Sequence, residues 1–371
     1  MLRYSSKQIK VGKVKVGGGA PIVVQAMTKT DSEDLESTFA QVKKLSQAGA
    51  KIIRLALPTL KSTRIIPIIK ENIETTLVAD IHFDYRIALE AINQGIDKVR
   101  INPGNLEKED ILQIVNRARE KKIPLRVGVN SGSLEKELQK RVRNSSKNET
   151  KILAEAMVQS ALETIEFLER ERFFDIVISL KSPDVSTTIL ANRLMAEKIS
   201  YPLHLGITAA GPLSYGIIKS SLALGALLSQ GIGDTIRVSL TADPVKEVEV
   251  AREILQFLHL ADEGPVLLSC PTCGRCKGEV KLIVEKLLPQ IKNLSIPLKI
   301  AVMGCEVNGP GEAKQADIGI FCTHTGGVLF REGKFLRRVK KKEMVEALIK
   351  EIELYASRFS QKIFQKTQDS E

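Results

Sequence analysis

The sequence has no tryptophan, and aromatic residues make up only 4% of its 371 residues. It also contains no recognised nucleic-acid-binding motif. The formal net charge of +11 suits nucleic acid, an acidic protein or a phosphorylated substrate as a partner. Because aromatic residues are few and the motif is missing, nucleic acid is the weakest of these partners, and we expect none.

Long apolar runs are missing as well. No stretch approaches the ~18 consecutive apolar residues of a membrane-spanning helix, and the first residues lack the apolar core of a signal peptide. The five cysteines are odd in number and clustered, which disfavours a disulfide framework and favours a reducing compartment. We therefore expect a cytoplasmic protein that has no membrane association.

A repeated pattern fills most of the chain: a short apolar run ends in polar residues and is followed by a stretch with helical periodicity. Eight such strands over roughly 250 residues, after a hairpin in residues 8–19, predict an α/β fold of the TIM (β/α)8 barrel type. A doubly wound open sheet is the alternative. The expected strands are Ile22–Ala26, Lys51–Leu55, Thr76–Asp80, Lys98–Ile101, Leu125–Val129, Ile176–Leu180, Leu203–Ile207 and Thr235–Ser239. The expected helices include Leu35–Gln47, Tyr85–Gln94, Glu109–Lys121 and one that begins after Asp243.

Cations and polar side chains gather at the carboxyl ends of these strands, where TIM barrels carry their chemistry. A cation inside a barrel is costly unless it is paired or meets an anionic ligand. For any single cation, a satisfied ion pair is as good an interpretation as a functional role. Five of them exceed the charge of the one nearby carboxylate and favour a diphosphate, because guanidinium groups bind phosphate oxygens in bidentate fashion. The cations are Arg54, Arg100, Arg126, Lys181 and Arg237, and the polar neighbours are Asp80, His82, Asn102, Asn130, His204 and Ser239.

The pattern changes near Ala261–Pro265, where we place a domain boundary. Residues 1–262 form the predicted substrate-binding barrel, and residues 263–371 form a small α+β domain. Its expected elements are strands Val266–Ser269, Leu298–Met303 and Asp317–Phe321, a hairpin at Val328–Val339, helices Gly278–Lys292 and Glu343–Arg358, and a frayed tail after Phe359.

Two charged stretches each have two interpretations. Residues 131–150 form either a lid or a solvated surface insertion. Residues 331–342 carry seven cations and one acid, Glu332. A solvated strand face is the favoured interpretation of that second stretch, and a docking patch for an acidic electron carrier is the other.

The most specific motif is Cys270-Pro-Thr-Cys273-Gly-Arg-Cys276, with a second limb at Met303-Gly-Cys305 that runs on to Asn308-Gly-Pro-Gly-Glu312. Spacing alone supports a structural zinc ribbon and an iron–sulfur site about equally. The first limb is denser than a zinc knuckle needs, and the second brings one cysteine instead of two. Glu312, predicted on a tightly turned loop, adds an exchangeable oxygen ligand, which suits a metal position that opens to substrate.

These motifs, with VQAMTKTD, VADIHFDYRIAL, VRINPGN, GVNSGSLE, HLGIT and GIGDTIRVSLTADP, resemble the 4-hydroxy-3-methylbut-2-enyl diphosphate synthase family of the non-mevalonate isoprenoid pathway over nearly the whole chain. The resemblance implies an iron–sulfur oxidoreductase that opens and dehydrates 2-C-methyl-D-erythritol 2,4-cyclodiphosphate with two electrons. It also implies a 4Fe-4S cluster, ferredoxin or flavodoxin as electron donor, and a homodimer in which the small domain of one chain closes on the barrel of the other. The implied cluster ligands are Cys270, Cys273, Cys305 and Glu312, with Cys276 as a bystander.

The chain departs from the family after the seventh strand. The family usually has a glutamate in an Ile-Thr-Glu-Ala-Gly segment, and this chain has Ala209 there. That acid is a candidate proton donor, so His82, another acid or Glu312 is expected to supply the proton for the leaving water. Two alternatives from other classes remain: a pterin-binding-like barrel enzyme with an appended zinc ribbon, and a non-catalytic basic protein that binds nucleic acid.

Overall fold

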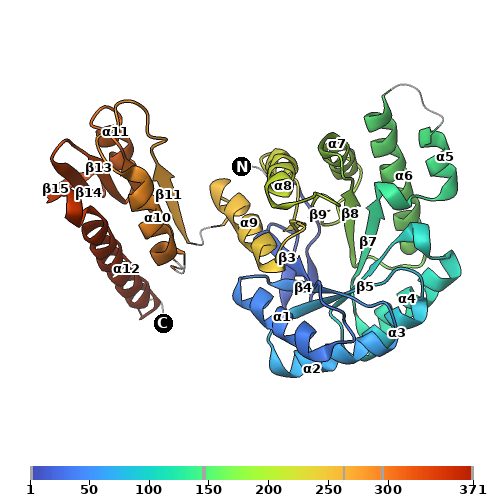
Figure 1. Ribbon diagram of the computed structural model, residues 1–371. Coiled ribbons are helices and arrows are strands. Elements are labelled where there is room, and N and C mark those ends of the chain that lie inside the picture. Colours follow the sequence, from blue (N-terminus) through green and yellow to red (C-terminus); the bar gives the residue numbers. More distant parts are fainter. Residues whose placement is uncertain (1–2, 144–147, 262–263, 293, 295, 369–371) are drawn as a thin grey trace. The chain divides into compact units, whose positions relative to one another are not determined.

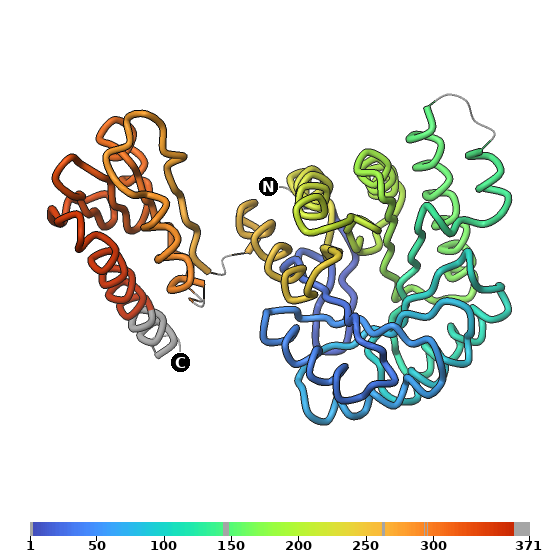
Figure 2. The backbone as a smooth tube through the Cα atoms, viewed as in Figure 1, coloured from blue at the N-terminus to red at the C-terminus, as the bar shows by residue number. Residues whose placement is uncertain are grey.

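The computed structural model describes residues 3–143, 148–261, 264–292, 294 and 296–368, with side chains as far as residue 359 (Figure 1). The chain divides into two compact units, Met1–Ala261 and Asp262–Glu371, and the backbone trace in Figure 2 follows each of them. Among the described residues, no helix combines the length and the apolar character that a membrane crossing requires.

The first unit is a closed ring of parallel strands. Seven ladders join them in the order β8-β7-β6-β5-β4-β3-β10-β9, and a parallel bridge between Ile178 and Leu203 closes the ring. The predicted TIM barrel is therefore confirmed. The strands are β3 (Val23–Met27), β4 (Ile52–Ala56), β5 (Thr76–Asp80), β6 (Lys98–Ile101), β7 (Leu125–Asn130), β8 (Ile176–Lys181), β9 (His204–Leu205) and β10 (Thr235–Ile236).

Helices follow the strands and surround the ring (Figure 1). Four of them begin at an aspartate whose carboxylate accepts a backbone N–H of the first turn: Asp34, Asp84, Asp184 and Asp243. The helices are α1 (Leu35–Gln47), α2 (Ile65–Asn72), α3 (Tyr85–Asn93), α4 (Lys108–Lys121), α5 (Lys136–Arg143), α6 (Glu149–Arg170), α7 (Val185–Ala196), α8 (Leu213–Leu228) and α9 (Pro244–Phe257), with short 3-10 turns at Lys61–Arg64, Pro103–Asn105 and Ser131–Ser133.

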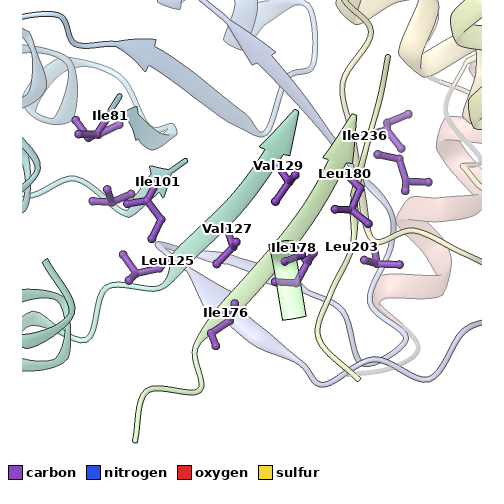
Figure 3. Close-up of a cluster of buried hydrophobic side chains, with 14 of the residues drawn as sticks. Ile81, Ile101, Leu125, Val127, Val129, Ile176, Ile178, Leu180, Leu203 and Ile236 are labelled. Atoms are coloured by element: carbon purple, nitrogen blue, oxygen red, sulfur yellow. The ribbon is translucent and has the colours of Figure 1, made fainter. Parts of the chain in front are cut away.

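Strand alternation separates the core from the barrel interior. Leu125, Val127 and Val129 of β7 belong to the large apolar cluster between strands and helices, as do alternate residues of β8 (Figure 3). Because successive side chains of a strand point to opposite faces, Arg126 and Asn130 face the inside of the barrel. At the amino ends of the strands, the hairpin of β1 (Ile9–Val11) and β2 (Val14–Val16) packs on a second apolar cluster.

The charged stretch 131–150 is not one long loop. It contains the helix α5, whose Leu138 is buried. Two hydrogen bonds tie this segment to α6: Arg141 donates to Gln159 over 2.9 Å, and Ser160 donates to Glu135 over 2.9 Å. Residues 144–147 lie outside the described part of the chain.

The second unit is a five-stranded sheet in the order β11-β12-β13-β14-β15. Its strands β11 (Pro265–Ser269), β12 (Leu298–Met303) and β13 (Ile318–Cys322) are parallel, and β14 (Gly326–Arg331) and β15 (Lys334–Lys340) are antiparallel. Helices α10 (Val280–Ile291) and α12 (Met344–Gln368) share one apolar cluster with the sheet, and α11 (Gly309–Lys314) shares another. A 3-10 turn, Lys341–Glu343, joins β15 to α12.

Two predictions for this unit are wrong. The tail after Phe359 is not frayed, because α12 continues to Gln368, and Tyr355 and Phe359 stack one turn apart along it. Glu312 is not on a tight loop, because Gly309–Lys314 forms the short helix α11. Proline is compatible with a first helical turn, so Pro310 starts this helix instead of breaking it.

Candidate active site

A cavity of about 180 Å3 lies at the carboxyl ends of the barrel strands. Every barrel strand from β4 to β8 contributes at least one lining side chain, and the segments after β5, β9 and β10 contribute the rest. The lining residues are Arg54, Asp80, His82, Arg100, Arg126, Asn130, Ser179, Lys181, Ile207, Thr208, Arg237 and Ser239. A larger cavity of about 600 Å3, lined by Lys13, Lys70 and Asp97 among others, lies at the amino ends of the strands. The chemistry of TIM barrels is located at the carboxyl ends, so we assign the site to the smaller cavity.

Asp80 is the first of two carboxylates that organise the cations. Its two oxygens lie 3.2 Å from Arg100 Nη1, 3.9 Å from Arg54 Nε and 3.3 Å from His82 Nε2. Burial raises the pKa of Asp80, but Arg54, His82, Arg100 and Arg126 together outweigh burial and hold its pKa well below the ordinary value. Asp80 is therefore ionised, and it fixes the orientation of two arginines and of His82.

The second carboxylate, Glu247, was missed in the sequence analysis. It lies in the first turn of α9 and is buried. Its oxygens lie 3.4 Å from Arg237 Nη2 and 2.9 Å from Lys29 Nζ, and it accepts the backbone N–H of Leu240 over 2.7 Å. Its position in the first turn of the helix after the eighth strand was the sequence feature that could have identified it as a site residue. The sequence does not show that this face of the helix turns inward.

The cations of the cavity exceed these two carboxylates. Arg126 is fully buried, and its Nε and Nη1 atoms have no hydrogen-bond partner among the described residues. Arg100 Nε and Arg237 Nε are also unpartnered there. Burial, with the neighbouring arginines, lowers the pKa of Arg126 well below its ordinary value. Buried guanidinium groups whose donors meet no protein acceptor are suited to bind an anion.

Lys98 is a further buried cation that the sequence analysis did not single out. It begins β6, it is completely buried, and its Nζ has no hydrogen-bond partner in the described part of the chain. Burial, followed by the charges of Arg126 and Arg54, lowers its pKa to about 7. Lys98 does not line the cavity, so it contributes to the field inside the barrel and not to the wall of the site.

His204 does not line the cavity, although it was predicted among the substrate-binding residues. Its Nε2 lies 3.0 Å from Lys181 Nζ, and its Nδ1 lies 2.8 Å from Thr235 Oγ1. Burial and the charge of Lys181 lower the pKa of His204, so the ring is neutral and can accept a hydrogen bond from Lys181. A Cβ at Gly206 would lie 3.0 Å from Lys181 Nζ, so this glycine leaves room for the lysine.

Asn102 and His82 have different surroundings. Asn102 is buried, accepts the backbone N–H of Gly104 and donates to Ser133 Oγ over 2.9 Å, so it shapes a loop and does not line the cavity. His82 lines the cavity with its side chain 44% exposed, and its Nδ1 lies 3.4 Å from Asn105 Nδ2.

In the second unit, the predicted cluster motif lies at one end of the sheet. Cys270 follows β11 and Cys305 follows β12, and the two parallel strands are paired along their length. The backbone N–H of Cys270 donates to Val302 O over 3.0 Å, and that of Lys277 donates to Gly304 O over 2.7 Å. The strand pairing therefore brings the two limbs of the motif together.

Gly304 is the point where thiols meet. A Cβ at this position would lie 2.7 Å from Cys276 Sγ and 3.3 Å from Cys270 Sγ. Cys276 donates to Gly278 O over 3.1 Å, whereas Cys273 is exposed. A fifth thiol, Cys322, ends β13 and is buried. Burial and the thiols of Cys276 and Cys270 raise the pKa of Cys322 to about 11, so it stays protonated.

The donor set fits an iron–sulfur cluster. Hydrogen bonds from the backbone N–H groups of Val307 and Asn308 lower the pKa of Cys305, which favours the thiolate that binds iron. N–H donors to sulfur are a usual feature of protein-bound clusters. Among the described residues, no three His, Cys, Asp or Glu side chains already stand in the geometry that holds a single metal ion. Glu312 is exposed in α11, a few residues beyond these donors.

Two family models match the chain: the GcpE TIM-barrel domain over residues 6–252, and the GcpE protein C-terminal domain over residues 266–354. A 4-hydroxy-3-methylbut-2-en-1-yl diphosphate synthase (flavodoxin) of Caldanaerobacter subterraneus subsp. tengcongensis is 50% identical over 353 residues, which are 95% of this chain and 98% of the relative. The enzyme with the same description from Thermodesulfovibrio yellowstonii is 47% identical over 94% of this chain and 99% of the relative.

Among solved structures, a dihydropteroate synthase of Coxiella burnetii in complex with pteroic acid is similar, with a TM-score of 0.51. The match covers 68% of this chain and 98% of that chain at 14% identity. At this identity the likeness shows the barrel fold alone. It does not favour a pterin-binding enzyme, since both family models and the similar sequences point elsewhere.

Proposed function

The chain belongs to the GcpE family of 4-hydroxy-3-methylbut-2-en-1-yl diphosphate synthases, and we propose that it divides this work between its two units. It is an oxidoreductase of isoprenoid biosynthesis. The reaction is the reductive ring opening of 2-C-methyl-D-erythritol 2,4-cyclodiphosphate, which takes up two electrons and two protons and releases water. The observation that carries the proposal is the set of buried, unpartnered guanidinium groups around the barrel cavity.

The barrel holds the diphosphate. Arg126 offers two donor nitrogens, Nε and Nη1, and Arg100 and Arg237 offer one each. Arg54 and Lys181 complete the cationic wall, and Asn130 and Ser239 add polar groups to it. Asp80 and Glu247 orient the guanidinium groups, and His204 positions Lys181. Charge-assisted hydrogen bonds of this kind contribute about 1.5–3 kcal/mol each.

His82 supplies a proton to the leaving hydroxyl group. It lines the cavity from the loop after β5, and its Nε2 lies 3.3 Å from Asp80 Oδ2 and 3.3 Å from Arg100 Nη1. A protonated Nε2 donates to the carboxylate of Asp80, whereas an unprotonated one accepts from Arg100. The methyl group of Ala209, at the end of the seventh strand, cannot donate a proton in place of His82. Among the residues that line the cavity, His82 is the one imidazole.

The small unit holds a 4Fe-4S cluster through Cys270, Cys273, Cys305 and Glu312. When bound, the cluster supplies the two electrons one at a time. A carboxylate is a harder and more exchangeable ligand than a thiolate, so Glu312 would be the most exchangeable member of this ligand set. Cys276 and Cys322 stay outside the ligand set.

Flavodoxin, which the names of the similar enzymes print, is the proposed electron donor. We also propose a homodimer, as the family resemblance implies, in which the small unit of one chain delivers electrons to the barrel of the other. The cytoplasm is the proposed compartment, because the five cysteines are unpaired and a reducing environment keeps them so.

Anaerobic purification followed by iron, sulfide and zinc analysis, a visible spectrum and turnover with a chemical reductant tests this function. We expect about four iron atoms and four sulfides per chain and reduction of the cyclodiphosphate. Ser in place of Cys270, Cys273 or Cys305 should abolish iron binding, whereas Cys276→Ser should retain it. A colourless protein that contains zinc would favour the barrel enzyme with a zinc ribbon.

Glu312 has its own test. Glu312→Cys is expected to retain iron and sulfide and to lose turnover, because thiolate is the better ligand for this softer site and does not leave it. Glu312→Ala is expected to lose iron on exposure to air. Normal turnover of Glu312→Cys with a complete cluster would contradict the role given to this carboxylate.

A further inference from the structure

The outer edge of the small sheet is strongly basic. We call the exposed cations Lys334, Arg337, Arg338, Lys340, Lys341 and Lys342 the basic edge. They lie on β15, the last strand of the sheet, and on the turn that follows it. Among them, Lys341 has an ion pair, to Glu279 over 3.2 Å. No ion pair joins the other five to a carboxylate within the described residues.

Strand register places one end of the basic edge beside the thiols. β13 ends at Cys322, which pairs with Gly327, and the neighbouring Gly326 pairs with Lys340. β11, β12 and β13 are parallel, so Cys270, Cys305 and Cys322 follow or end strands at this same end of the sheet. Glu279, the partner of Lys341, is three residues from Cys276. The Lys340–Lys342 run therefore borders the thiol site.

An exposed aromatic ring lies within the basic edge. Phe335 is 58% exposed and packs edge-on against Phe330, with ring centroids 6.3 Å apart. Phe330 in turn contacts Phe321, whose centroid is 5.4 Å away, in the apolar cluster that α11 covers. An apolar group beside unpaired cations is typical of a surface that binds a protein of opposite charge. Phe335 pairs with Phe330, toward the Lys334 end of β15, so it extends this surface away from the thiol-bordering end.

Lysines on an edge strand also have a purely structural explanation, because they prevent pairing with other chains. That explanation accounts for cations along β15. It does not account for the continuation of the charge into Lys341 and Lys342, beyond the strand, or for the exposed cations Arg275 and Lys277 on the cysteine turn. Exposed acids lie near these cations, including Glu279, Glu306, Glu332 and Glu343, so the region is basic without being free of carboxylates.

We propose that the basic edge, at its thiol-bordering end, is the docking surface for an acidic flavodoxin-type electron carrier. This inference rests on the proposed function. Each encounter transfers one electron from the reduced flavin of the carrier to the small unit, and the flavin is oxidised by one electron. Two encounters supply the two electrons of one turnover. Electrostatic steering by such a surface raises association rates 10-fold or more, and salt weakens it.

The test compares two double variants of the anaerobically purified, cluster-containing full chain. Lys340→Glu/Lys342→Glu reverses two charges of the basic edge. The control Lys286→Glu/Lys350→Glu makes the same change in net charge on exposed positions of α10 and α12. Stopped-flow oxidation of hydroquinone-state flavodoxin gives the second-order rate at low and at high salt. Turnover with dithionite, iron content and light scattering are measured on the same samples.

We expect the first variant to react with flavodoxin about tenfold more slowly at low salt, with the difference shrinking at high salt. The control and the dithionite-driven turnover should stay at the level of the parent. Equal slowing of both variants, or of neither, would overturn the proposal. A lower molar mass for the first variant alone would also overturn it, because the surface would then bind a second copy of the chain. Absent dithionite-driven turnover in the parent would instead overturn the proposed function.

Discussion

At the scale of single residues, the barrel cavity is a place where cations outnumber carboxylates. Asp80 and Glu247 contact Arg54, Arg100 and Arg237. Arg126, Lys98 and Lys181 have no carboxylate partner within the described residues. Desolvation of an unpaired cation costs free energy of folding, which the ligand-free protein does not recover. We therefore expect these cations to lower the stability of the ligand-free protein while they raise its affinity for the substrate.

Arg126→Met tests this opposition. Removing a buried, unpartnered guanidinium group is expected to raise the thermal midpoint of the ligand-free protein and to weaken substrate binding at least about tenfold. Arg100→Met is the matched comparison, because it leaves Asp80 with fewer partners and should lower the midpoint. Calorimetry measures both quantities. A lowered midpoint for both variants would show that Arg126 is not an uncompensated charge.

Lys98 gives a pH-dependent prediction. Its pKa in the folded protein is about 7, below the ordinary lysine value of 10.5, so the unfolded chain binds the extra proton between these values. The contribution of Lys98 to stability is therefore most unfavourable below pH 7, and it improves by about 1.4 kcal/mol per pH unit until the lysine is neutral in both states.

Lys98→Met should accordingly be more stable than the parent at pH 7, with the difference vanishing near pH 10. Urea unfolding of the barrel from pH 6 to 10 measures this difference. A difference that does not change with pH would mean that Lys98 is charged in the fold across this range.

At the scale of elements, the capped first turn of α9 positions a carboxylate of the site. Asp243 Oδ1 accepts the backbone N–H of Val245 over 2.8 Å, and Pro244 occupies the first turn. Glu247 lies within the same first turn and binds Arg237. The start of this helix therefore determines where the second organising carboxylate of the cavity lies.

Asp243→Ala is expected to destabilise the barrel by about 1 kcal/mol, because one backbone N–H loses its acceptor. Asp243→Asn keeps an acceptor oxygen at the same place and should cost less than half of that. Urea unfolding of the two variants measures the effect. Equal destabilisation by Ala and Asn would indicate that the charge of Asp243, and not the cap, stabilises α9.

At the scale of the whole molecule, the two units have separate apolar cores. The largest cluster lies between the barrel strands and their helices, and two further clusters lie on the two faces of the small sheet. Every residue that lines the barrel cavity belongs to Met1–Ala261. Each unit therefore contains the contacts that its own site needs.

A chain that ends at residue 261 is expected to unfold cooperatively and to bind the cyclodiphosphate within about threefold of the full chain, since a threefold change corresponds to well under 1 kcal/mol. It should not reduce the substrate, because the thiols are absent. Titration calorimetry on both chains measures the affinities. A loss of binding greater than tenfold would show that the small unit contributes to the diphosphate site.

The sequence by itself determined the family, the barrel and most strand positions. Thr76–Asp80, Lys98–Ile101 and Leu298–Met303 begin and end where they were predicted, because each is a short segment rich in branched apolar residues between turn or polar residues. The last two barrel strands are shorter than predicted, at His204–Leu205 and Thr235–Ile236. A Cβ at Gly206 would lie 2.4 Å from Arg237 O, so the two segments approach closely there, and such a contact is set by tertiary structure.

Only the tertiary structure decided which polar residues face the cavity. His204 and Lys181 are both in or next to apolar strands, yet His204 lies behind Lys181 and away from the cavity. Lys98 and Glu247 look like ordinary charged residues in the sequence, and closure of the barrel buries both. The physical reason is that local pattern sets the face of a strand or helix, whereas the depth of a side chain and its counter-charges depend on elements that are far apart in the chain.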